Sequence, residues 1–235
     1  MNKLVRYAAV LLFASLVASS TFADEALDAL EKKLVAQWSK IESISTKITM
    51  SMEMQGMTQK GEGMMEYVKK GDKEMQRMEL KSEMTMGGGQ TMASSTLTIN
   101  DGEYTYTLTE MMGQKTAMKS KSDKGQGTLI GGKMFENLKK DNTVTVLPDE
   151  SVGGKDAHVI KAVPKASGQP GANASKLFFA KDTGMMIQML SIDPAGKTVM
   201  TTSYSDVKIN GTIDPARFVF KAPAGVTVME MPAMP

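Results

Sequence analysis

The sequence predicts an α+β protein that is mainly β, with one helix followed by an antiparallel meander of short strands. Three observations predict this fold class. Apolar residues recur every three or four positions over residues 27–41, which is helical spacing. Apolar and polar residues then alternate through most of the chain, as in half-buried strands, and tight-turn sequences separate the alternating runs. No strand–helix–strand rhythm that would indicate a parallel sheet is found.

The first 23 residues have the organisation of an export signal. Lys3 and Arg6 form a basic segment, residues 8–17 are apolar, and Thr21-Phe22-Ala23 is a small-x-small cleavage sequence. This apolar run is shorter than the roughly 20 residues that a membrane-spanning helix needs. We therefore expect cleavage after Ala23, export from the cytoplasm, and a single domain over residues 24–235.

The helix predicted after the leader has one apolar stripe, and Asp24 and Glu25 lie in its first turn, where the helix dipole favours acids. The stripe needs a sheet or groove to pack on. It consists of Leu27, Leu30, Leu34, Trp38 and Ile41.

Turn sequences such as Asn100-Asp101-Gly102 and Asp182-Thr183-Gly184 divide the rest of the chain and indicate hairpins. Within 120–142 the spacing of Leu129, Ile130, Met134, Phe135 and Leu138 predicts a short amphipathic helix, and 164–174 reads as an exposed loop. The predicted strands are 46–55, 62–69, 75–84, 91–99, 103–109, 115–119, 143–147, 156–163, 175–181, 185–193, 198–208 and 218–221.

Methionine dominates one predicted strand face. Ile48, Met50, Met52 and Met54 alternate with polar residues, and the chain contains 23 Met but only 7 Phe and 1 Trp. Methionine is flexible and polarizable, so it adapts to irregular partners. Such a face is either a loosely specified core or a wall that receives a flexible apolar ligand, and the pattern alone leaves both interpretations open.

Several classes of function lack their sequence signals. Without Lys3 and Arg6 the 28 basic residues become 26, equal to the 26 acidic ones, so the charge expected of a nucleic-acid binder is missing. With no cysteine there is no disulfide framework and no N-terminal cysteine to carry a lipid anchor. The single histidine, His158, has no nucleophile motif or metal-binding spacing around it, and we expect it at the surface or rim. We therefore expect no catalytic residues, no cofactor and no enzyme.

Copper binding is the alternative from another class, because thioethers are soft ligands that suit Cu(I). Close Met spacings occur within 50–57, 84–86 and 229–234. Along one strand, however, successive methionines on a face are about 7 Å apart, so a shared ion would need ligands from a neighbouring strand. The set of metal ligands stays undefined.

Three segments resemble the LolA family of periplasmic lipoprotein carriers. The best match is the end of the chain, where Phe218-Val219-Phe220-Lys221-Ala222-Pro223-Ala224-Gly225-Val226-Thr227-Val228 fits the family's F-x-F-x-x-P-x-G-V-x-V ending. The stretch from Asn100 to Tyr106 is similar to its D-G-x-x-x-aromatic hairpin, and the stretch from Gly61 to Lys70 to its strand ending in V-K-R-P. The family's lid arginine falls at Lys70 and the following proline at Gly71.

The resemblance implies an incomplete, half β-barrel whose helices cover a hydrophobic cavity for acyl chains. It implies a monomeric periplasmic carrier of lipoproteins or lipid, with an inner-membrane donor and an outer-membrane acceptor; an envelope sensor or interaction domain is a further alternative. We expect Lys70, Met134, Phe135 and Leu138 to form the lid, and Phe135→Asp to weaken acyl binding with little loss of stability. The expected lipid-binding residues are Ile48, Met50, Met52, Met54, Met65, Tyr67, Met78, Leu80, Leu97 and Ile99.

Overall fold

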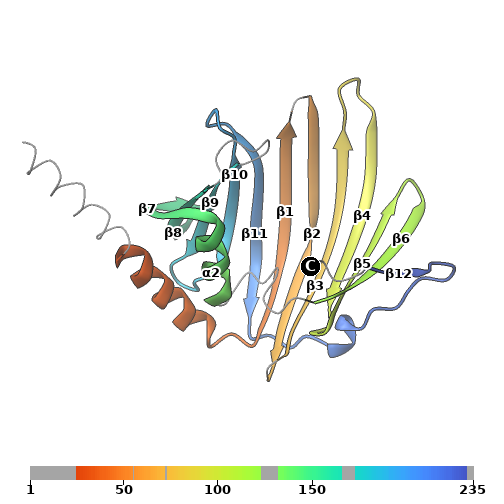
Figure 1. Cartoon of the computed structure of the whole chain (residues 1–235), viewed down its shortest axis with the longest axis horizontal. Helices are drawn as coiled ribbons and strands as arrows, with labels where there is room; N and C mark the ends of the chain where they lie inside the picture. The colour runs from red at the N-terminus through yellow and green to blue at the C-terminus, as the bar shows by residue number, and fades with distance from the viewer. Residues whose placement is uncertain (1–24, 55, 72, 123–131, 166–172, 232–235) are drawn as a thin grey trace, which may run out of the picture.

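A single twelve-stranded sheet forms the body of the protein in the computed structural model, which describes residues 25–54, 56–71, 73–122, 132–165 and 173–231 (Figure 1). The expected leader, 1–23, lies outside the described residues. The strands are β1 (Ser43–Met54), β2 (Met57–Lys70), β3 (Lys73–Thr85), β4 (Thr91–Asn100), β5 (Tyr104–Met111), β6 (Gln114–Lys121), β7 (Asn142–Val152), β8 (Lys155–Pro164), β9 (Ala174–Ala180), β10 (Met186–Ile192), β11 (Thr198–Ile209) and β12 (Val228–Glu230).

The sheet is open. Its strand order is β12-β6-β5-β4-β3-β2-β1-β11-β10-β9-β8-β7, so the edge strands β12 and β7 do not pair and the sheet does not close into a barrel. All neighbouring strands are antiparallel except β12, which adds in parallel to β6. The expected half-barrel architecture, mainly β with an N-terminal helix, is confirmed. The predicted hairpin turns at Gly102 and Gly184 are also present, each glycine having a positive φ that L-residues rarely adopt.

Two helices lie on one face of this sheet, which we call the inner face; the opposite one is the outer face. They are the N-terminal helix, residues 25–38, and α2 (Gly132–Asp141), and Figure 1 shows both on the side of β7–β11. The expected helical stripe is confirmed, because Leu27, Leu30, Leu34 and Trp38 are all buried. They pack with inner-face residues of the sheet, including Ile44 and Phe179. The two helices therefore cover one half of the inner face.

Aromatic stacking fixes α2 in place. Phe135 is fully buried, and its ring centroid is 5.8 Å from that of Trp38 and 6.4 Å from that of Phe179. Met134 and Leu138 pack against the same core while remaining partly exposed. The Phe135 side chain thus joins both helices to the sheet, and from this position we expect it to contribute to stability, contrary to the prediction that a change there leaves stability nearly unchanged.

The chain after β11 differs from the prediction of a strand at 218–221. Pro215–Phe218 forms a 3-10 turn, η1, capped by the Asp214 side chain, and the following residues cross the outer face before β12 joins β6. Phe218 is buried and Phe220 stacks on Tyr106 at 5.0 Å between ring centroids. The strand prediction at 218–221 is wrong because Phe218 ends η1 and Val219 caps it; the apolar residues there are held by side-chain packing on the outer face instead of by a strand ladder.

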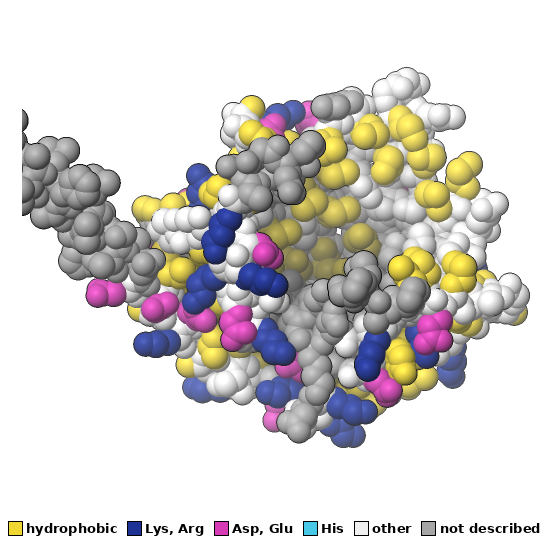
Figure 2. All heavy atoms as spheres, viewed as in Figure 1, with side chains coloured by type: hydrophobic (Ala, Val, Ile, Leu, Met, Phe, Trp, Pro, Cys, Tyr) yellow, Lys and Arg dark blue, Asp and Glu magenta, His cyan; other side chains and the backbone are white. Residues whose placement is uncertain are grey.

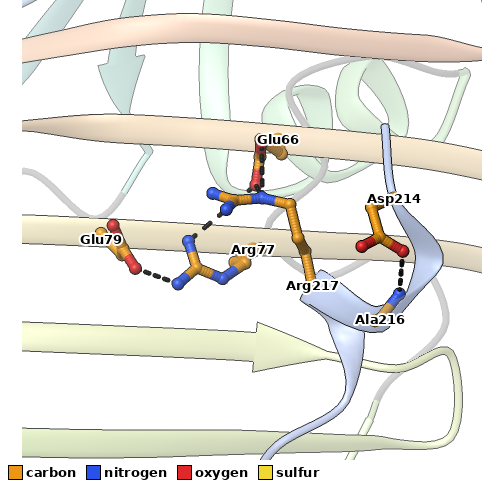
Figure 3. A network of polar contacts seen from close by, with 6 residues as sticks. All are labelled: Glu66, Arg77, Glu79, Asp214, Ala216 and Arg217. Carbon is orange, nitrogen blue, oxygen red and sulfur yellow. Dashed lines mark hydrogen bonds and ion pairs between the residues drawn. The ribbon is translucent and has the colours of Figure 1, made fainter. Parts of the chain in front are cut away.

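An ion network fastens this C-terminal segment to the sheet (Figure 3). The Arg217 Nε donates to both carboxylate oxygens of Glu66, at 2.9 and 2.7 Å. Arg77 lies 3.9 Å from the same carboxylate and also pairs with Glu79. The hydrogen bond from Arg217 to Glu66 raises the pKa of Arg217, so this guanidinium stays charged.

Among the described residues, no helix is long and apolar enough to cross a membrane.

Candidate functional site

Methionines gather on the part of the inner face that the two helices leave uncovered. The register pairs Met52 with Met200, Met65 with Met78, and Met84 with Met92. Paired residues of neighbouring strands point to the same face, so these side chains form one surface across β11 and β1–β4. Figure 2 looks onto this face and shows hydrophobic side chains lining a hollow in the middle of the molecule.

Two glycines lower the floor of this surface. Gly61 and Gly63 of β2 are inner-face positions opposite Met50 and Ile48 of β1. A Cβ on Gly63 would overlap the backbone carbonyl oxygen of Glu79, whereas a Cβ on Gly61 would meet its nearest atom at 3.3 Å. Because β2 has no side chain at these two positions, Ile48 and Met50 of β1 stand across a shallow trough from Leu80 and Ser82 of β3. The stretch of β2 without side chains is two inner-face positions long and ends at Gln59 and Met65.

Eight of the ten expected lipid-binding residues share the inner face. Ile48, Met65 and Tyr67 are buried, and Met50, Met52, Met78 and Leu80 are half-buried, while Met54 at the tip of β1 is 44% exposed. The burial of Tyr67 and its proximity to Glu74 raise the pKa of the phenol well above its usual value. Burial likewise raises the pKa of Tyr204, the partner of Ile48 on β11, to about 12.

The placement of Leu97 and Ile99 on this face is wrong. Across β3 and β4, Leu97 pairs with Glu79 and Ile99 with Arg77, whereas Thr98 pairs with Met78. Leu97 and Ile99 therefore belong to the outer face, where Ile99 is buried. Alternation fixes the faces within a strand, but the β3–β4 turn sets which residues of β4 lie opposite Met78.

The four expected lid residues are not brought together. Met134, Phe135 and Leu138 lie on α2 against the helix-side core, but Lys70 ends β2 in an exposed position paired with Lys73. By its register Lys70 points to the outer face, away from α2. The described part of the chain therefore has no latch between Lys70 and α2. This corrects the expectation that Lys70, which aligns with the family's lid arginine, lies with α2 in a lid.

A second kind of inner-face surface, on β4–β6, was not predicted from the sequence. Here the register aligns threonines: Thr98 with Thr107, and Thr96 with Thr109 and then Thr116. The alternating threonines at 96 and 98, and at 105, 107 and 109, were the available signal. This alternation of threonines indicates a shared surface only when the strand register is known, because the register puts these threonines on the same face as the methionines.

The outer face also has a depression, of about 1140 Å³, over β11 and β1–β5. Its side chains come mostly from outer-face positions and are Ser, Thr, Lys and Glu, for example Ser51, Lys60 and Glu83. Of the expected lipid-binding residues, only Met50 contributes to it. A lining of charged and hydroxyl groups favours water over an acyl chain.

His158 is not isolated, although it is the only histidine. Its Nδ1 is 2.9 Å from Asp149 Oδ1, and its Nε2 is 2.9 Å from the Nζ of Lys33 on the N-terminal helix. Hydrogen bonds from Lys181 and from His158 hold the pKa of Asp149 below its usual value. This group ties the helix to β8 at the rim of the sheet, where the His158 side chain is 16% exposed and that of Asp149 is 45% exposed.

No family model and no curated protein matches the chain. Solved structures with a similar fold include MucB, at 12% identity and a TM-score of 0.46 over 84% of this chain and 62% of that chain. The chain thus spans about three fifths of the length of MucB. Others are the lipoprotein LppX of Mycobacterium tuberculosis (13% identity, TM-score 0.45, 82% of this chain and 99% of that chain) and an uncharacterized conserved protein of Thermus thermophilus (10%, 0.47, 88% and 98%). Identities this low do not bear on function.

Proposed function

We propose that the protein is a periplasmic carrier that binds the acyl chains of lipoproteins or lipids on the methionine-rich inner face. The observation that supports this most directly is the trough between β1 and β3, which the two helices leave uncovered: Ile48, Met50 and Leu80 flank Gly61 and Gly63 there, and Met52 and Met78 extend the same apolar surface. A buried permanent core would place the helices over these residues, but both helices lie over β7–β11.

Burial alone supplies enough free energy for such binding. Each buried methylene contributes about 0.8 kcal/mol, so a C16 chain gains on the order of 10 kcal/mol before ordering costs. Thioether side chains can follow the many conformations of an acyl chain at little cost. An apolar surface of this kind has no switch of its own, so release requires a competing acceptor, in keeping with a donor at the inner membrane and an acceptor at the outer membrane.

The test compares two adjacent residues of β1 that point to opposite faces. Met50→Asp places a carboxylate in the trough, and we expect acyl-chain affinity to fall by at least about tenfold, measured by displacement of a fluorescent fatty acid. The matched control is Ser51→Asp, because Ser51 is exposed on the outer face. Equal affinities for the wild type and Met50→Asp, or no acyl binding by the wild type, would reject the proposal.

Cu(I) binding is the second candidate, because the sheet provides the cross-strand methionine pairs that a single strand lacks. Met84 and Met92 form one such pair, and Met52 and Met200 another. A double variant, Met84→Leu with Met92→Leu, separates the two functions, since leucine keeps the apolar volume but has no sulfur. A carrier retains acyl binding in this variant, whereas a protein that binds copper at Met84 and Met92 loses Cu(I) affinity in a competition titration with a Cu(I) chelator; Met52→Leu with Met200→Leu tests the other pair in the same way.

A further inference from the structure

The inner face combines two chemistries side by side. On β1–β3 and β11 its side chains are mainly Met, Ile, Leu and Tyr, whereas on β4–β6 they are mainly Thr and Ser; we call the latter surface the hydroxyl half. Methionines occur in it only at Met92, Met111 and Met118. The members of the hydroxyl half are Ser94, Thr96, Thr98, Thr105, Thr107, Thr109, Thr116 and Ser120.

Most of these hydroxyls are available to a ligand. The Ser94 Oγ is 2.9 Å from the Ser82 Oγ, at the boundary with the methionines. Within the described chain, the side-chain hydroxyls of Thr96, Thr98, Thr107 and Thr109 have no hydrogen-bond partner. All four residues are half-buried, so they face the hollow without being sealed. A ligand lying there replaces water at these groups instead of breaking a hydrogen bond within the protein.

Charge is kept off this face. Among the described inner-face positions of β1–β6, Lys69 and Glu74 are charged, and they pair with each other at the lower end of the sheet. The charged side chains of the strands, such as Lys81 and Glu83, lie on the outer face. Phosphate and carboxylate groups are normally bound by Arg or Lys, whereas neutral ester and hydroxyl oxygens are satisfied by threonine and serine hydroxyls.

We propose that the hydroxyl half binds the uncharged ester and glyceryl oxygens of a glycerolipid whose acyl chains lie along the methionines of β1–β3. This inference rests on the proposed carrier function and specifies its ligand class: a neutral diacylglyceryl group, free or attached to a protein, in preference to an anionic lipid. The strand order supports it, because β4 follows β3 directly and brings Thr98 and Thr96 within one strand spacing, about 5 Å, of Met78 and Leu80, with the hydroxyls of β5 and β6 on the next two strands.

Two probes with identical acyl chains test the preference: dioctanoylglycerol, which is neutral, and dioctanoyl phosphatidate, which is anionic. Binding to the wild type is measured by calorimetry below the micelle concentration of each lipid. We expect dioctanoylglycerol to bind at least tenfold more tightly. The triple variant Thr98→Val, Thr107→Val and Thr109→Val removes three hydroxyls but keeps the β-branched shape, and it should weaken dioctanoylglycerol binding by about 30-fold, roughly threefold for each hydroxyl.

The matched control places the same three changes on the outer face, as Thr49→Val, Thr58→Val and Thr201→Val, and should leave both affinities unchanged. Thermal unfolding verifies that each variant is folded. If the wild type binds both lipids equally, or the inner-face triple variant binds dioctanoylglycerol as the wild type does, the headgroup inference is overturned while the carrier function stands. If the wild type binds neither lipid, the carrier function itself fails.

Discussion

Removing the Phe135 side chain tests whether α2 is part of the permanent core or a detachable lid. Phe135 is fully buried and stacks between Trp38 and Phe179, so Phe135→Ala loses its burial and two aromatic contacts. Buried Phe→Ala changes cost about 3–5 kcal/mol, and we expect about 4 kcal/mol here. For a domain of this size, about 3 °C per kcal/mol gives a fall in Tm of about 12 °C.

The assay is urea unfolding followed by circular dichroism, with Asn137→Ala as the control because Asn137 is an exposed residue of the same helix. The control should stay within about 0.5 kcal/mol of the wild type. A helix that detaches freely contributes little to global stability, so a loss below about 1 kcal/mol for Phe135→Ala would refute the assignment of α2 to the core. Hydrogen exchange of the α2 amides, slow for a core helix and fast for a lid, gives an independent measurement.

Three further predictions concern the sheet and its C-terminal segment. Gly63→Ala should destabilise the protein by more than about 2 kcal/mol in urea unfolding, because its Cβ overlaps the backbone of β3. Gly61→Ala should cost less than half as much, because its Cβ makes a tight contact with the Lys81 carbonyl oxygen, at 3.3 Å, but no overlap. Glu66→Gln leaves two arginines without their shared carboxylate and should cost about 2–3 kcal/mol and speed proteolysis of 211–227; unchanged cleavage would count against the network. Since burial raises the pKa of Tyr204 to about 12, the unfolded chain ionises first, so stability should be intact below pH 10 and fall between pH 10 and 12. Tyr204→Phe should flatten that fall in urea titrations at pH 8, 10 and 11, and an identical slope would contradict it.

Much of the fold was predictable because it depends on local patterns. The helical stripe ending in Trp38, the strand alternation around Met50 and the glycine turns at Gly102 and Gly184 are each set by neighbouring residues. The sequence also predicted that Ile48, Met50 and Met52 share one face, because successive side chains of a strand alternate. What alternation cannot give is the alignment of one strand with the next.

That alignment and the long-range packing were decided by the tertiary structure. The β3–β4 turn put Thr98 beside Met78 and moved Leu97 and Ile99 to the outer face, which also created the hydroxyl half. Phe135 became core because Trp38 and Phe179, distant in sequence, meet it in space. By itself, the sequence therefore determined the elements and their apolar sides. The register and the contacts between distant segments determined which side chains share a surface, because their energies depend on residues that no local pattern relates.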